Sequence, residues 1–351
     1  MKGRRIIHEI RINRKDTRMT QNSRELVKGL FEGKSIERPP FFPWVCSFAA
    51  TIEQVQVKSM LSDPGILTRA LSNSHKLFGY DIILNHFDPA LEAEALGCET
   101  EWHDNNSLPV VTGHPLADGT DFYDLDTEGI ESKGRIPVIF EATKRLILTK
   151  GKEVPIAAMI TGPFTLAEHL KGKEFTRQLE ASDDEALDLV EDAGSICLKL
   201  CRIYCELGVD IVVIAEDIQA PGINDLTSVM ASPLKSIFNV SRFYNVNSIL
   251  ISRIRNDDQA LSICSLGADA VSISGTTNTD QVREKAREAD CLISITVPDS
   301  VFTEPDPEST SLLTHSLTSG KSGLFLTSEW EVPRDTDINS MHEIMKIIRA
   351  E

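Results

Sequence analysis

The feature that most constrains the fold is a series of eight short apolar runs, separated by segments with helical periodicity. The runs are rich in Val, Ile and Leu and mostly lack polar–apolar alternation, which indicates strands covered on both faces. We expect these strands at residues 41–48, 81–88, 155–161, 210–216, 248–253, 269–274, 291–297 and 323–328. Helices are expected at 51–61, 64–78, 164–169, 183–207, 233–244, 257–266, 279–288 and 337–349. This alternation predicts an α/β fold with a single (β/α)8 barrel.

The domain organisation follows from length and charge distribution. A chain of 351 residues is long for an ordinary domain but normal for one α/β barrel. Residues 1–18 contain seven Lys and Arg against two acids, in a chain whose formal net charge is -17. We interpret 1–18 as a basic extension, either disordered or upstream of the real start at Met19, with one barrel domain over 19–351. A basic targeting arm is the alternative.

The longest stretch between two expected strands, 89–153, has a middle rich in Gly, Asn and Asp at 104–119. Loops of that length in a compact domain usually have a function or contain structure of their own. We therefore expect a lid or an additional hairpin over the barrel mouth.

The composition argues against several classes of binding partner. The strongly negative net charge disfavours nucleic acid and anionic membranes. No apolar run approaches the ~18 residues that a membrane-spanning helix needs. The seven Cys are an odd number, and no secretory hydrophobic segment precedes them, so we expect reduced thiols in a cytoplasmic protein.

In a parallel barrel the chemistry gathers at the carboxyl ends of the strands. The stretch 81–98 has this character, because a buried strand ends at His86 and Asp88 before Pro89 stops it. The candidate acid–base residues at strand ends are His86, Asp88 and Glu216. The candidate binding residues are Trp44, Asp217, Arg253, Arg255, Glu329 and Trp330. The simpler alternatives are that His86 and Asp88 cap the next helix and that the acids form a polar rim.

Five segments, in order and at the expected spacing, resemble the uroporphyrinogen decarboxylase superfamily. They are 87–98 (FDPALEAEALGC), 160–171 (ITGPFTLAEHLK), 214–222 (IAEDIQAPG), 266–274 (LGADAVSIS) and 332–341 (VPRDTDINSM). They look most like its methylcobamide:coenzyme M methyltransferase branch, and the resemblance covers nearly everything after Met19. It implies a TIM barrel of the uroporphyrinogen decarboxylase type that accepts a tetrapyrrole-type partner at its mouth. It also implies a corrinoid of the methylcobalamin type, presented by a separate corrinoid protein.

Two departures from the family pattern narrow the expected chemistry. The decarboxylase has an arginine-rich motif after its first strand, whereas 44–51 (WVCSFAAT) holds no basic residue before Lys58, so uroporphyrinogen decarboxylation is not expected. The methyltransferase branch binds zinc through His-x-Cys after the fifth strand and Cys after the eighth. The matching positions here are Ser252, Ile254 and Trp330, which supply neither nitrogen nor sulfur ligands. We therefore expect no zinc site.

Without zinc, the residues at the carboxyl end of the fifth strand must serve another purpose. Since Ser252 and Ile254 share one face, we expect Arg253 to turn toward the helices and pair with a helix acid. The alternative is that Arg253 and Arg255 bind a carboxylate, a phosphate or the methyl acceptor. Trp330 is expected to fill the space of the metal, or to stack on a flat ring.

Three functions remain. The preferred one is methyl transfer between a corrinoid protein and a small-molecule donor or acceptor, without a zinc-bound thiolate. The first alternative is a non-catalytic family member that binds a corrinoid or a corrinoid protein. The second is a lyase related to uroporphyrinogen decarboxylase that acts on another substrate.

Overall fold

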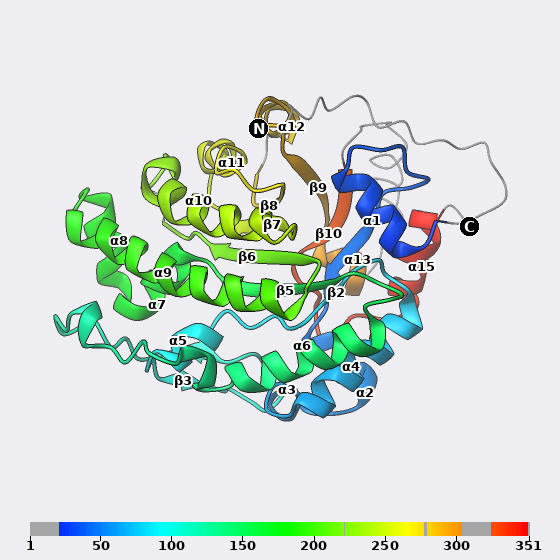
Figure 1. Ribbon diagram of the computed structural model, residues 1–351, viewed down its shortest axis with the longest axis horizontal. Helices are drawn as coiled ribbons and strands as arrows, with labels where there is room; N and C mark the ends of the chain where they lie inside the picture. Colours follow the sequence, from blue (N-terminus) through cyan, green and yellow to red (C-terminus); the bar gives the residue numbers. More distant parts are fainter. Residues whose placement is uncertain (1–20, 221, 277–278, 304–323, 350–351) are drawn as a thin grey trace.

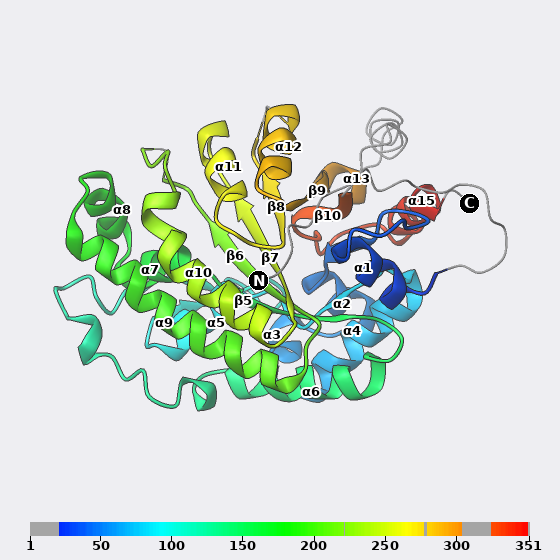
Figure 2. The same cartoon turned by 45° about the horizontal axis from the view of Figure 1, so that its top comes forward.

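The computed structural model describes residues 21–220, 222–276, 279–303 and 324–349, so the basic segment 1–18 lies outside the described residues. Eight parallel strands form one curved sheet in the order β1-β10-β9-β8-β7-β6-β5-β2, with helices outside it (Figures 1 and 2). The strands are β1 (Phe41–Trp44), β2 (Ile83–Leu84), β5 (Ile156–Thr161), β6 (Ile211–Asp217), β7 (Asn247–Arg253), β8 (Ala270–Ser274), β9 (Leu292–Val297) and β10 (Leu324–Glu331). They form a nearly closed barrel, which confirms the predicted fold class.

A buried carboxylate joins the two edge strands. The backbone N–H of Asp81, just before β2, donates to the Phe41 carbonyl at 2.8 Å. The fully buried Asp81 side chain accepts from the Phe41 N–H, from both terminal nitrogens of Arg38 and from the Ser23 hydroxyl, at 2.6–2.8 Å. Asp81 thus ties the first helix and the starts of β1 and β2 together at the amino-terminal end of the barrel.

The described helices are α1 (Ser23–Phe31), α2 (Ser47–Glu53), α3 (Val57–Met60), α4 (Pro64–Phe78), α5 (Leu91–Ala95), α6 (Ile136–Lys150), α7 (Pro163–Lys171), α8 (Lys173–Glu180), α9 (Asp184–Leu207), α10 (Thr227–Phe243), α11 (Asp257–Cys264), α12 (Thr279–Glu288), α13 (Asp299–Thr303) and α15 (Ile338–Arg349), with 3-10 turns at Phe122–Asp124 and Ile130–Ser132. The expected single helix at 51–61 is wrong, because Gln54 adopts a left-handed conformation (φ 58°) that ends α2. The helices α1, α5, α6, α8 and α13 lie outside the expected ranges given above.

The expected hairpin is present in the long connection. Antiparallel strands β3 (Thr100–Glu101) and β4 (Val110–Val111) form it. The Lys58 N–H of α3 donates to the carbonyl of Asn105, which lies in the loop of this hairpin, at 3.0 Å. The Leu116 N–H, after the hairpin, donates to the carbonyl of Leu170 in α7, also at 3.0 Å.

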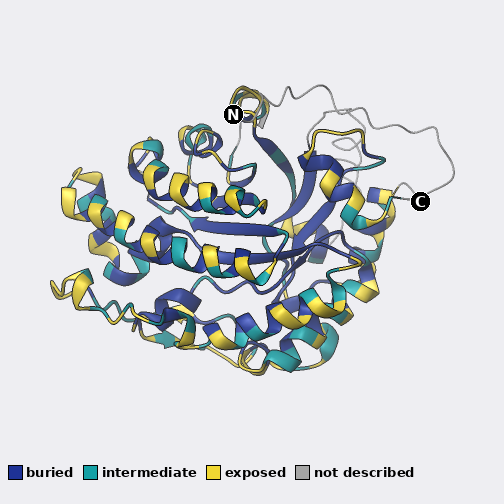
Figure 3. Ribbon diagram, in the orientation of Figure 1, coloured by how far each residue is buried: buried dark blue, intermediate teal, exposed yellow. Residues whose placement is uncertain are grey.

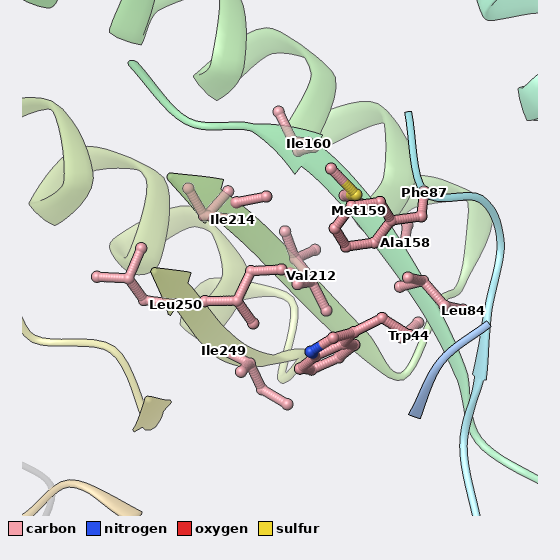
Figure 4. Close-up of a cluster of buried hydrophobic side chains, with 14 of the residues drawn as sticks. Trp44, Leu84, Phe87, Ala158, Met159, Ile160, Val212, Ile214, Ile249 and Leu250 are labelled. Carbon is pink, nitrogen blue, oxygen red and sulfur yellow. The ribbon is translucent and has the colours of Figure 1, made fainter. Parts of the chain in front are cut away.

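The burial of the residues follows the two layers of the fold, the strands inside and the helices outside. The described strands of the barrel wall are almost continuously buried, while each long helix exposes one face (Figure 3). Trp44, Phe87 and Met159 belong to the cluster of buried side chains in Figure 4. All seven cysteines are buried and free. No described helix is long and apolar enough to cross a membrane.

Candidate functional site at the carboxyl end of the barrel

Three hydroxyl groups identify the inner face of the barrel. Ser272 Oγ on β8 lies 2.8 Å from Thr327 Oγ1 on β10, and Ser294 Oγ on the intervening β9 lies 2.9 Å from Ser272 Oγ. Short side chains two strands apart can meet only on the concave face of a curved sheet, because they diverge on the convex face. These three hydroxyls therefore point into the barrel.

The strand register extends this face to β7. Ile251 pairs with Ser272 and Arg253 with Ser274, and paired residues of parallel strands point to the same side. Arg253 is thus on the inner face, whereas Ser252 and Ile254 are on the outer face. The expectation that Arg253 turns toward the helices is wrong, because the sequence-based phase of this strand was off by one residue.

Four side chains meet across the barrel mouth. Arg253 Nε donates to Asp217 Oδ1 at 3.0 Å, and Nη2 pairs with the other oxygen of Asp217 at the end of the neighbouring strand β6. The Arg253 guanidinium lies 4.9 Å from the centre of the Trp330 ring. Trp330 also makes an edge-to-face contact with Phe87, with ring centres 5.1 Å apart. The predicted binding residues Asp217, Arg253 and Trp330 are therefore together, but the partner of Arg253 is a strand-end acid rather than a helix acid.

Two further carboxyl groups adjoin this cluster: Asp299 lies near Arg253, and Glu329 lies near Asp299. Burial raises the pKa of Asp299, and the Arg253 charge partly offsets that rise. Burial also raises the pKa of Glu329, and the negative charge of Asp299 raises it further. Of these two, Glu329 was predicted and Asp299 was missed. The available signal was its position two residues after the expected strand 291–297.

His86 is buried, and its tautomer follows from its neighbour. Asn85 Oδ1 accepts from the Met159 N–H at 3.0 Å, while Asn85 Nδ2 donates to Thr143 Oγ1 at 3.0 Å, which fixes the amide orientation. His86 Nδ1 lies 2.9 Å from Asn85 Oδ1 and must therefore carry the proton. His86 Nε2 is left as a buried acceptor without a partner among the described residues. Burial, with the Arg135 charge, lowers the His86 pKa to about 3, so the ring is neutral.

Asp88 is fully buried and committed to structural contacts. It pairs with Arg135 Nη1 at the start of α6 and accepts from the Ala90 N–H at 3.0 Å. Arg135 also binds Glu94 at 2.7 Å. Burial raises the Asp88 pKa, and Arg135 opposes that rise. These contacts anchor the loop that carries His86, and Arg135 is the member of the network that sequence reasoning missed.

Glu216 lies on the outer face of β6 and not in the mouth. Its carboxyl accepts from the Phe164 N–H at 3.1 Å and from the Thr165 N–H and hydroxyl at 2.9 and 2.6 Å. The side chain thus satisfies the first turn of α7, where backbone N–H groups have no helical partner. Gly162 packs against the same carboxyl so closely that a Cβ would overlap it.

Two other predicted residues stand apart from the mouth contacts. Trp44 is fully buried, and its Nε1 has no hydrogen-bond partner within the described part of the chain. Arg255 is exposed, and its backbone N–H donates to Gln259 at 2.8 Å.

A family model described as Uroporphyrinogen decarboxylase (URO-D) matches residues 22–350. The chain belongs to this family. Among curated relatives, the methylcobamide:CoM methyltransferase MtbA of Methanosarcina mazei is 27% identical over 185 residues, covering 50% of this chain and 53% of that protein. A methylated-thiol–coenzyme M methyltransferase of the same organism is 28% identical over 155 residues, covering 44% of this chain and 41% of that protein. The chain thus matches about half the length of these relatives.

A solved structure supports the fold of this URO-D family member. A methyltransferase from Methanosarcina mazei superposes with a TM-score of 0.80 at 17% identity, over 94% of this chain and 98% of that one. At this identity the match shows the shared fold, and the chemistry must be argued from the residues of this chain.

The zinc-ligand pattern that the family resemblance implied for the methyltransferase branch is not matched by the residue types at the corresponding positions of this chain. The matching positions Ser252 and Ile254 face away from the mouth, and the inward position between them is Arg253. A guanidinium is cationic and does not ligate zinc. Among the residues that the structure describes, no group of three His, Cys, Asp or Glu side chains is arranged to hold a metal ion.

Glu216 makes stability depend on pH in a direction that can be tested. Burial raises its pKa from 4.5 to about 7, so the folded state holds a proton that the unfolded state has lost between these values. Stability from this group is therefore full below about pH 4.5 and falls as pH rises to about 7. We expect the wild-type advantage over Glu216→Gln in unfolding free energy to shrink by about 2–3 kcal/mol from pH 5 to pH 8. Urea titrations at both pH values measure it, and a constant difference would contradict the assignment.

Proposed function

We propose that this protein transfers a methyl group between a corrinoid carried by a partner protein and a small molecule, at the barrel mouth and in the cytoplasm. The relatives named as methylcobamide:CoM methyltransferases and the methyltransferase fold support this reaction class. The corrinoid would supply the cobalt–carbon bond from which, or to which, the methyl group moves. Neither nucleic acid nor a membrane is part of the proposed assembly.

The observation that carries the proposal is the residue at the inner end of β7. The matching positions for two of the metal ligands are Ser252 and Ile254, but the strand register puts Arg253 on the inner face at the end of β7, where Asp217 and Trp330 hold it. We infer that the small molecule is positioned by charge instead of through a zinc-bound thiolate. The Trp330 ring covers one face of the guanidinium, and Phe87 packs edge-to-face against that ring.

The acid–base assignments are part of the proposal. His86 would provide a neutral imidazole whose open Nε2 lone pair accepts a hydrogen bond, since its lowered pKa makes it a weak acceptor of a full proton. Asp88 and Glu216 would support catalysis by fixing the His86 loop and the start of α7, since their oxygens are already hydrogen-bonded. Trp44 and Arg255 are proposed as peripheral contacts.

The test is a corrinoid assay combined with metal analysis. Tag-free protein purified with zinc available should contain far less than stoichiometric zinc by mass spectrometry. With methylcob(III)alamin and a panel of acceptors, the visible spectrum should show acceptor-dependent loss of the methyl–cobalt species. Arg253→Met should lower the rate at least about 100-fold, by removing a charge-assisted contact of about 3 kcal/mol. Arg145→Met, at an exposed, ion-paired arginine of α6, is the matched control and should stay near the wild-type rate.

Each other outcome identifies another function. A spectral shift without demethylation across the panel would favour a non-catalytic corrinoid-binding protein. Near-stoichiometric zinc would overturn the metal-free proposal and bring back thiol activation. Loss of carboxyl groups from a tetrapyrrole substrate would support the lyase alternative.

A further inference from the structure

The guanidinium of Arg253 is held in place, but not all of its hydrogen-bond donors have an acceptor. Asp217 occupies Nε and one N–H of Nη2, and Trp330 covers one face. A guanidinium has five N–H donors, so the edge that includes Nη1 remains, and no described residue accepts a hydrogen bond from Nη1. The side chain is 44% exposed. This edge matches the two oxygens of a carboxylate.

The two existing contacts make Arg253 a prepared binding group. An arginine side chain that is free in solution loses rotamer entropy when it binds a ligand, which weakens binding. Here the ion pair with Asp217 and the stacking on Trp330 already order the side chain. Asp217 and Trp330 are therefore positioning residues for an incoming anion.

The surrounding charges determine what else the ligand must carry. Asp217 pairs with the guanidinium, Asp299 lies near enough for the Arg253 charge to offset part of the rise in its pKa, and Glu329 lies beside Asp299. Arg253 is the ion-pair partner of Asp217, and no described Lys, Arg or His forms an ion pair with Asp299 or Glu329. A simple anion would be repelled by them, whereas a ligand that also carries an ammonium group would balance their charge.

We propose that the barrel mouth binds a small zwitterion, whose carboxylate pairs with the open edge of Arg253 and whose ammonium faces Asp299 and Glu329. This inference rests on the proposed function in one respect, because the zwitterion would be the small molecule that exchanges the methyl group. Binding itself involves no corrinoid and can be measured separately.

Isothermal titration of the full chain with probes of increasing charge separation tests the proposal. The probes are alanine, β-alanine and 4-aminobutyrate, each compared with the carboxylate that lacks its amine and the amine that lacks its carboxylate. We expect one zwitterion to bind about tenfold or more tightly than both of its single-charge analogues. Arg253→Met should abolish that binding, and Arg145→Met, which removes an equally exposed, ion-paired arginine on α6, should leave it unchanged. The double variant Asp299→Asn/Glu329→Gln should remove the preference over the carboxylate alone.

The remaining outcomes overturn the inference. Equal binding of the zwitterion and the plain carboxylate would show that the acids do not contribute, and binding of the amine alone would show that Arg253 does not. No binding of any probe to a folded chain, as checked by circular dichroism, would contradict the site. Zwitterion binding with a failed corrinoid assay would refute the proposed function but not this site. Methyl transfer to an uncharged acceptor by a protein that binds none of the zwitterions would refute the site but not the function.

Discussion

Replacing Arg38 with methionine is expected to lower the free energy of unfolding by about 3–5 kcal/mol, because the change leaves a buried carboxylate without its counter-charge. Asp81 is fully buried, and Arg38 binds both of its oxygens at 2.6 and 2.8 Å. The Phe41 N–H and the Ser23 hydroxyl remain as partners but carry no charge. The pair closes the seam between β1 and β2, away from the mouth. Urea denaturation followed by circular dichroism measures the effect.

A matched control separates burial from the loss of an ion pair as such. Arg145 pairs with Glu141 at 2.8 Å on the exposed surface of α6, so Arg145→Met should change stability by no more than about 0.5 kcal/mol. The double variant Arg38→Met/Asp81→Asn should be less destabilised than the two single changes added together, because each single change leaves an unpaired charge and the double variant leaves none. A loss below about 1 kcal/mol in Arg38→Met would contradict the assigned role of the pair.

Gly162→Ala is the second change with a large expected effect, at about 3 kcal/mol or more of lost stability. The added methyl group would overlap the Glu216 carboxyl, which three hydrogen bonds hold against the start of α7. The carboxyl must then move, and the buried N–H groups of Phe164 and Thr165 lose their acceptor. Thermal or urea unfolding at pH 7 measures the loss.

Removal of the carboxyl provides the test of mechanism. In a Glu216→Ala background the overlap is gone, so Gly162→Ala should cost less than about 1 kcal/mol there. Gly65→Ala in α4 is the control glycine, where the new methyl would lie 3.1 Å from an Asp63 oxygen, and should stay within about 1 kcal/mol of wild type. If the Gly162 and Glu216 changes are additive, the two residues are not coupled as described.

The positions of the strands could be predicted because their physical cause is local. A chain segment buried on both faces must be apolar throughout, and all eight apolar runs overlap the eight observed strands. The hairpin in the long connection was predictable for a related reason, since Gly, Asn and Asp favour turns. The helix α6, which follows these turn residues in the same connection, was not predicted.

Burial on both faces made the position of β7 predictable, but it also hid which of its side chains face the inside of the barrel. In a strand with both faces buried, alternation carries no information, so Ser252–Ile254 and Ile251–Arg253 were equally consistent with the inner face. The wrong choice sent Arg253 toward the helices. The register with β8 shows the opposite, and it places Arg253 on Trp330.

The same limit separates Glu216 from Asp217. The sequence shows two adjacent acids at a strand end and cannot say which one faces the mouth. The structure places Asp217 beside Arg253 and Glu216 against the start of α7.

The sequence by itself therefore determined the barrel, the order of its strands along the chain and the set of strand-end residues from which a site could be built. Only the tertiary structure decided which of those residues meet: Asp217 and Arg253 with Trp330 over the mouth, and Asp88 with Arg135 behind it. The physical reason is that hydrophobic burial acts through local composition. The side of the sheet on which a side chain lies depends on strand register and sheet curvature, which are set by contacts between segments far apart in the chain.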